Sequence, residues 1–167
     1  MTSLRRLWPL LVLGALLAGC APAALGTSPT NPFPIASQDI ATTPGGRLYV
    51  QIPYTFADFG IDPTKMTGML WVPSGYNSET AVVTSTFSLT NVQVPEGWRM
   101  TVAQVQATRV HLAPLRSIDK GSTQYSLMVV LEIHAKPEAV SGPYHLSASM
   151  TYKTTSKAIH VDLRVMR

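Results

Sequence analysis

The chain has 167 residues, with 13 lysines and arginines, 9 aspartates and glutamates, one cysteine and a formal net charge of +4. This length suits a single domain with short appendages. A lone cysteine excludes an intrachain disulfide, so core burial alone must stabilise the fold. The basic residues form no cluster that could follow a phosphate backbone, which argues against nucleic-acid binding.

The first twenty residues have the layout of a secretory signal peptide. Arg5 and Arg6 precede an apolar run over residues 7–17, and small residues follow it. The sequence Leu17-Ala18-Gly19-Cys20 resembles the lipobox of bacterial lipoproteins. The resemblance implies that residues 1–19 are removed, that the Cys20 thiol carries diacylglycerol, and that the new amino terminus carries an acyl chain such as palmitate. Several acyl chains together give stable membrane anchoring, which a single chain does not.

Two other interpretations of this segment are a transmembrane helix and a cleaved signal peptide followed by an incidental cysteine. An apolar run of about eleven residues is too short to cross roughly 30 Å of hydrocarbon, which takes about twenty residues. A free thiol is unusual in an exported protein, which favours lipidation of Cys20. We therefore expect a lipid anchor in the cell envelope. In some bacteria with two membranes, an aspartate directly after the lipidated cysteine resembles a signal for retention in the inner membrane. Residue 21 is alanine, so we expect the outer membrane if the organism has two membranes.

Residues 20–46 are expected to form the lipidated cysteine and a flexible tether. Prolines recur here amid Ala, Ser and Thr, without apolar periodicity. Extended as polyproline II, this segment could hold a domain up to roughly 80 Å from the membrane. Phe33, Ile35 and Ile40 support an alternative, in which part of the segment adds an edge strand to the domain or docks on a partner.

Alternation with a period of two residues begins at Arg47, and the domain is expected to occupy residues 47–167. Leu48, Val50 and Ile52 predict a half-buried strand, followed by a loop or helical turn over residues 55–65. A second strand is expected over residues 66–72, ended by the turn signal of residues 73–75. A third is expected over residues 80–94, where a change of parity near Asn91 predicts a β-bulge or two short strands.

The rest of the chain is also rich in predicted strands. Residues 104–112 alternate less regularly, with Val105, Val110 and Leu112 as the expected inward residues. The clearest alternation covers residues 125–133, 144–152 and 159–165. About seven strands and no long amphipathic helix predict an all-β fold, an antiparallel immunoglobulin-like sandwich.

Three motifs in this region carry a resemblance. They are Pro95-Glu96-Gly97-Trp98, Asp119-Lys120-Gly121-Ser122, and Ser141-Gly142-Pro143-Tyr144. Together, over residues 80–167, they resemble the bacterial immunoglobulin-like domains of the NPCBM-associated type. That family is a non-catalytic appendage of envelope proteins and secreted hydrolases. The resemblance therefore implies a role in scaffolding or docking, and it implies no catalytic residue and no cofactor.

The histidines are the first candidates for a metal site. The four histidines, His111, His134, His145 and His160, contain no His-x-His pair. The expected register of the last two strands separates His145 from His160 by roughly 13 to 20 Å, too far to share an ion. No Gly-x-Ser-x-Gly elbow occurs either. We therefore expect no metal site and no enzyme, and a copper- or zinc-dependent envelope enzyme is only a remote alternative.

The function expected from these features is that of a lipid-anchored, non-catalytic accessory protein of the cell envelope that binds another protein. The last strand is expected to be an edge that offers free backbone groups to a partner. Its exposed face carries His160, Asp162 and Arg164. Phe33 and Ile35 of the tether are further candidates for the contact.

A module that binds glycan or cell wall is the alternative. Its candidate residues are the aromatic side chains of Trp71, Tyr76 and Trp98, which could stack on a sugar ring. Trp98 has a competing interpretation, since a tryptophan next to a tight turn of a sandwich often packs inside, here against Met100 or the facing sheet.

Overall fold

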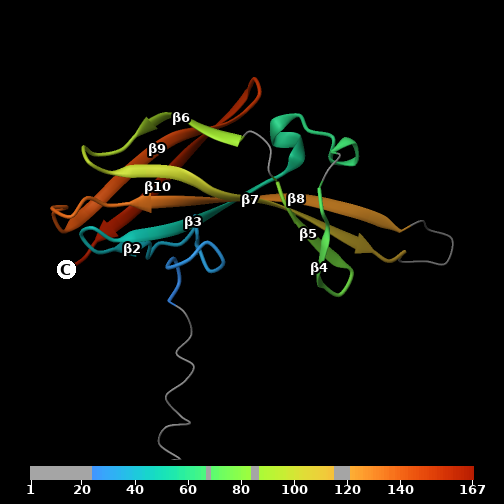
Figure 1. Cartoon of the computed structure of the whole chain (residues 1–167), viewed down its shortest axis with the longest axis horizontal. Helices are drawn as coiled ribbons and strands as arrows, with labels where there is room; N and C mark the ends of the chain where they lie inside the picture. The colour runs from blue at the N-terminus through green and yellow to red at the C-terminus, as the bar shows by residue number, and fades with distance from the viewer. Residues whose placement is uncertain (1–23, 67–68, 84–86, 115–120) are drawn as a thin grey trace, which may run out of the picture.

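Strands dominate the computed structural model, which describes residues 24–66, 69–83, 87–114 and 121–167 (Figure 1). The described strands are β1 (Phe33–Pro34), β2 (Ala41–Thr42), β3 (Arg47–Tyr54), β4 (Val72–Gly75), β5 (Ser78–Val82), β6 (Phe87–Gln93), β7 (Arg99–Leu112), β8 (Ser122–His134), β9 (Gly142–Tyr152) and β10 (Thr155–Val165). Two short 3₁₀ helices, η1 (Phe56–Phe59) and η2 (Pro63–Lys65), follow β3. The predicted lipobox with Cys20, and Asp119 and Lys120 of the predicted turn, lie outside the described residues.

The strands form two sheets packed face to face. One has six strands in the order β1-β3-β8-β7-β5-β4, and the other has four in the order β2-β10-β9-β6. All neighbouring pairs are antiparallel except the short strands β1 and β2, which pair in parallel with β3 and β10. The prediction of an all-β sandwich is confirmed, with more strands than the seven expected.

The core forms where alternate residues of β3, β8, β9 and β10 meet between the sheets. Leu131 and Ile133 of β8 are fully buried, as are Leu146 of β9 and Val161 of β10. The alternation seen in the sequence is therefore the inward face of each strand. Residues between them in β10 are exposed, as expected for a sheet with one face in solvent.

The N-terminal segment belongs to the sandwich and is not a tether from residue 24 onward. Phe33 pairs with Val50 of β3, and Ala41 pairs with Arg164 of β10. Ile40, between the two short strands, is only 2 % exposed. The chain therefore passes from one sheet to the other and covers part of an open edge of each, as in the alternative noted above. A flexible tether through residue 46 was wrong, because Ile40 is buried in the core and Phe33 and Ile35 pack partly buried against it.

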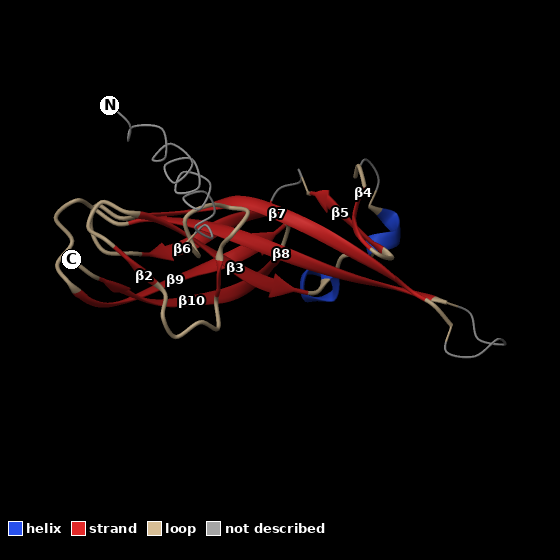
Figure 2. Ribbon diagram, turned by 90° about the horizontal axis from the view of Figure 1, so that it is seen from below, coloured by secondary structure: helices blue, strands red, loops and turns tan. Residues whose placement is uncertain are grey.

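The β7–β8 hairpin extends past the four-stranded sheet (Figure 2). β5 pairs with the far half of β7, and β4 pairs with β5 at the edge of the sheet. We call this extension, β4, β5 and the far halves of β7 and β8, the wing. A register shift between Val102 and Gln104 puts a β-bulge into β7. The bulge changes the parity, so Val105 and Ala107 are buried while Val110 and Leu112 lie on the opposite face. The expected inward position was thus wrong for Val110 and Leu112.

The strands between residues 66 and 94 also differ from the expected ones. The strand expected over residues 66–72 begins only at Val72, and residues 73–75 continue it instead of ending it. Residues 80–94 contain parts of two strands in different sheets, since β5 joins β7 and β6 joins β9. The bulge expected near Asn91 is confirmed by the positive φ of 49° there and the register shift between Thr90 and Gln93.

Candidate binding surfaces

The outer edge of β10 is partly open. β2 covers it only at Arg164 and Val165, where the Arg164 N–H donates to the Ile40 carbonyl over 2.9 Å. At the other end, Lys157 forms an ion pair with Asp58 of η1 at 3.5 Å. Backbone groups in an antiparallel strand alternate in direction, so Ala158, His160 and Asp162 face the same side as Arg164. The prediction of an edge strand therefore holds for the middle of β10 and not for its end.

The side chains beside this edge include a close His–Asp pair. The register places His145 of β9 opposite Asp162, and His145 Nδ1 lies 2.6 Å from an Asp162 carboxylate oxygen. His160 lies opposite Ser147, so the two histidines are diagonal neighbours on one face. The separation expected from the sequence was wrong because the strands pair two to four residues away from the assumed register. In the parts of the chain that the structure describes, no three His, Cys, Asp or Glu side chains converge on a metal site.

Trp98 lies inside the sandwich and is not a surface residue. Its side chain is 5 % exposed, and its ring centroid lies 4.8 Å from that of Tyr144. Gly97, with a φ of 80°, makes the turn that directs the indole inward. The indole Nε1 of Trp98 has no hydrogen-bond partner among the described residues. Trp98 was therefore wrong as a candidate for binding glycan or protein, and its expected packing on the facing sheet is what the structure shows.

The wing carries a cluster of polar and aromatic side chains that the sequence analysis missed. The Arg109 guanidinium lies 4.5 Å from the centroid of the Trp71 ring, and its Nε donates to Glu79. His111 Nε2 lies 3.1 Å from the same carboxylate oxygen, and His111 Nδ1 lies 3.1 Å from Thr123 Oγ1. Hydrogen bonds first from Arg109 and then from His111 lower the pKa of Glu79 below its usual value. The bulge in β7 places Arg109 and His111 on the same face as Val105 and Ala107.

The predicted surface residues fall into two separate groups. His160, Asp162 and Arg164 are exposed on β10 of the four-stranded sheet. Trp71 and Tyr76 belong to the wing of the other sheet, where Trp71 is half-buried under Arg109 and Tyr76 is 95 % exposed. Tyr76 stands in the turn between β4 and β5, followed by Asn77 with a positive φ of 59°. The structure does not join these groups into one site.

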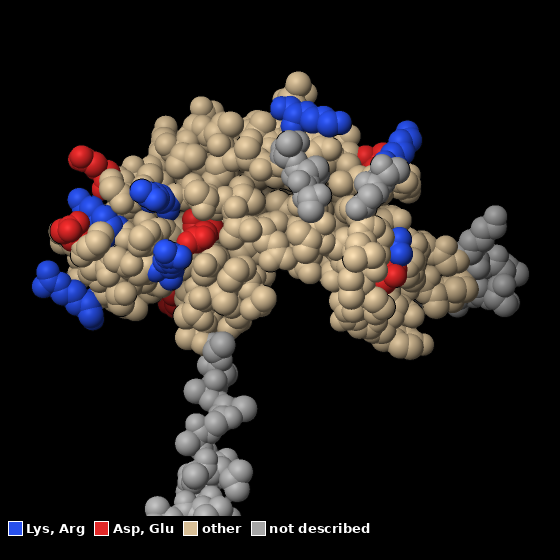
Figure 3. Space-filling view, viewed as in Figure 1, with Lys and Arg blue, Asp and Glu red and all other residues tan. Residues whose placement is uncertain are grey.

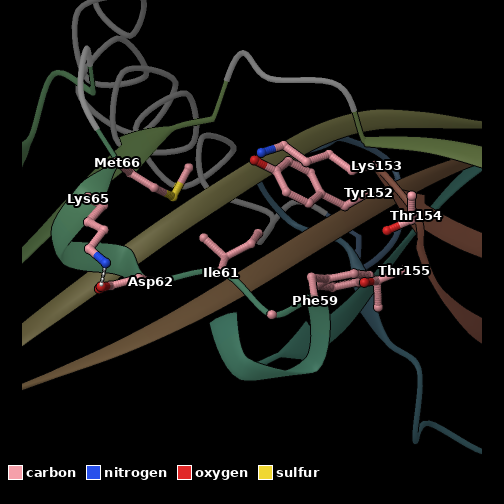
Figure 4. A pocket seen from close by; sticks show the side chains of 10 residues that line it. Phe59, Ile61, Asp62, Lys65, Met66, Tyr152, Lys153, Thr154 and Thr155 are labelled. Atoms are coloured by element: carbon pink, nitrogen blue, oxygen red, sulfur yellow. Dashed lines mark ion pairs between the residues drawn. The ribbon is translucent and has the colours of Figure 1, made fainter.

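A hollow of about 500 Å³ lies between the η1–η2 segment and the turn from β9 to β10 (Figure 4). Phe59, Ile61, Met66 and Tyr152 supply its apolar lining. Asp62 closes one side, where it forms an ion pair with Lys65 at 3.4 Å and accepts a hydrogen bond from the Thr64 N–H. The Thr64 hydroxyl first, and then the Thr64 N–H, lower the pKa of Asp62 below its usual value, and the carboxylate caps η2.

A second hollow, of about 220 Å³, lies on the outer face of the six-stranded sheet. Its floor is made by Gln51, Gln104, Gln106 and Val130, and its wall by the N-terminal loop of residues 24–32. In the space-filling view this face is indented between two projections, the N-terminal loop and the β4–β5 hairpin (Figure 3). The side-chain amides of Gln51, Gln104 and Gln106 form no hydrogen bond within the described part of the chain.

No protein-family model, no curated protein and no solved structure matches this chain. The likeness to NPCBM-associated domains therefore stays a prediction, and the structure defines the class of protein only as an all-β sandwich. No helix in the described residues is long and apolar enough to cross a membrane.

Proposed function

We propose that this chain is a lipid-anchored, non-catalytic module of the cell envelope that binds another protein by strand addition. The lipobox-like sequence at Leu17–Cys20 supports the anchor. The observation that carries the binding is the open stretch of β10 between η1 and β2. Backbone N–H and C=O groups of Ala158, His160 and Asp162 face outward there, and the adjoining side chains are exposed.

An extended segment of a partner would pair with this stretch and continue the four-stranded sheet. Main-chain hydrogen bonds would supply affinity, and side-chain contacts with Asp162 and Arg164 would supply specificity. The short strand β2 already binds the end of β10 in this way, in a parallel orientation. β2 also limits the partner to the stretch between residues 157 and 164.

The variant His160→Pro tests the binding. Proline removes the outward N–H of residue 160 and leaves the hydrogen bonds with β9 in place, because that N–H points away from β9. The control His160→Ala removes the imidazole and keeps the N–H. In pull-downs from solubilised native envelopes, we expect wild type and His160→Ala to recover a stoichiometric partner and His160→Pro to lose it. Equal recovery with both variants, or no partner with wild type, would refute strand addition.

The variant Cys20→Ser tests the anchor separately. We expect it to leave the membrane fraction, with the circular dichroism spectrum of the sandwich unchanged. Retention of a folded Cys20→Ser protein in the membrane would show that the anchor lies elsewhere.

Binding of glycan is the second candidate, favoured by the 95 % exposure of Tyr76 in the turn between β4 and β5. Isothermal titration with cell-wall oligosaccharides compares wild type with Tyr76→Ala. A loss of affinity in this variant supports the glycan function, and absence of binding by wild type excludes it.

A further inference from the structure

We propose that the outer face of the six-stranded sheet rests directly on a lipid bilayer, through the N-terminal loop and the β4–β5 turn (residues 75–77). This inference depends on the proposed anchor at Cys20. It states how the anchored domain is oriented on the membrane. The wing faces the lipid, and the open edge of β10, which belongs to the other sheet, stays free to bind a partner.

The point at which the chain leaves the domain is fixed by hydrogen bonds. The Gly26 N–H donates to the Asn31 carbonyl over 2.7 Å, and the Gly26 carbonyl accepts from the Tyr49 N–H of β3 over 2.8 Å. Gly26 has a φ of 78° and lies against the Phe33 ring. The N-terminal loop is therefore held on the sandwich from Ala24 onward.

The distance from this point to the anchor is short. Ala24 is the fourth residue after Cys20, with three residues between them. A fully extended chain covers at most about 3.6 Å per residue, so Ala24 lies within about 14 Å of the lipidated cysteine. This replaces the reach of roughly 80 Å that a tether through residue 46 would have given. The face that carries Ala24 must therefore lie close to the headgroups.

Two projections extend from that face. Figure 1 shows the N-terminal loop and the β4–β5 turn on the same side of the six-stranded sheet, opposite β6, β9 and β10. Leu25, 55 % exposed, belongs to the first, and Tyr76, 95 % exposed, to the second. The two contacts would keep the domain from pivoting about the anchor.

Both projections have the composition of a membrane interface. Residues 24–38 and 66–78 contain no charged side chain. Figure 3 agrees, since the ends of both projections show neither basic nor acidic atoms. Tyrosine favours the headgroup level, where its ring is buried and its hydroxyl stays hydrated. The hollow beside the N-terminal loop would then face lipid headgroups, whose oxygens can accept hydrogen bonds from the side-chain amides of Gln51, Gln104 and Gln106.

Depth-dependent fluorescence quenching tests this orientation. Cys20 is the only cysteine and is blocked when lipidated, so Tyr76→Cys can be labelled specifically with the fluorophore NBD. Val92→Cys is the matched control, because Val92 is exposed on β6 of the opposite sheet. The lipidated proteins are reconstituted into vesicles of phosphatidylethanolamine and phosphatidylglycerol that contain a lipid with a nitroxide on its headgroup.

We expect headgroup nitroxide to quench the label at residue 76 several-fold more than at residue 92, and aqueous iodide to show the reverse order. Equal, weak nitroxide quenching at both positions in a vesicle-bound protein would overturn the orientation and leave the anchor intact. A label at residue 76 shielded from both quenchers would also overturn it, since protein or glycan would then cover the turn. Failure of the wild-type chain to acquire lipid would remove the anchor, and the orientation with it.

Discussion

Gly26→Ala is the substitution that most directly tests how the N-terminal loop is held. A Cβ at this position would lie 2.1 Å from Cδ2 and Cε2 of the Phe33 ring, so the ring or the loop must move. The φ of 78° adds a backbone penalty of about 1–2 kcal/mol for any residue with a Cβ. Overpacking adds about 1–3 kcal/mol.

The total loss has an upper limit, because the loop can detach from β3. Detachment with local unfolding of the loop costs the hydrogen bond from Tyr49 of β3 to Gly26 and the one from Gly26 to Asn31 within the loop, at about 0.5–1.5 kcal/mol each. It also costs part of the burial of Phe33, which is worth about 1.5–3 kcal/mol when complete. We therefore expect Gly26→Ala to lower the free energy of unfolding by about 3 kcal/mol.

Gly60→Ala is the matched control for this prediction. Gly60 has a φ of 63°, and a Cβ there would meet no atom within 4 Å, so only the backbone penalty of about 1–2 kcal/mol applies. Urea unfolding followed by tryptophan fluorescence measures both variants. Hydrogen exchange of the Tyr49 amide should accelerate in Gly26→Ala alone, since that amide donates to Gly26. Equal losses of stability in the two variants would refute the proposed contact with Phe33.

Three further predictions concern pH and burial. Glu79→Gln should destabilise the fold at pH 7, and its effect on the melting temperature should shrink as pH falls from the unfolded pKa of about 4.3 through the lower folded pKa of Glu79. Burial, and then the charge of Asp58, raises the pKa of Tyr54 to about 12, so the folded state favours the neutral phenol. The neutral phenol of Tyr54 should contribute fully to the free energy of unfolding below about pH 10, and this contribution should be lost as pH rises through 12. In urea unfolding measured across this pH range, Tyr54→Phe should not show that loss. Ile40→Ala should cost about 2–5 kcal/mol in chemical unfolding, whereas a residue of a free tether would cost nothing.

The sequence predicts the central strands well, because one face of each strand lies in the core. The alternation over residues 125–133 and 159–165 matches the buried face of β8 and β10. It fails along β7, where one extra residue at the bulge moves Val110 to the other face. Residues 104–112 alternate too irregularly for this change of parity to stand out, unlike the change near Asn91.

The short strands β1 and β2, and the cluster around Arg109 and Glu79 in the wing, are harder to predict from the sequence. β1 and β2 have two residues each, too few for a period, and prolines around them favour the interpretation as a tether. The apolar character of Ile40 was the usable signal. Arg109 and Glu79 are paired across two strands thirty residues apart, and only the register of β5 on β7 brings them together.

The N-terminal segment connects the two proposals. It pairs β1 with β3 and β2 with β10, so the same stretch fixes where the chain leaves the domain and how much of the β10 edge stays open. If the anchor holds Ala24 close to the headgroups, the six-stranded sheet must face the lipid. The open part of β10 belongs to the other sheet, so a strand from a second envelope protein could reach it without displacing the domain from the membrane.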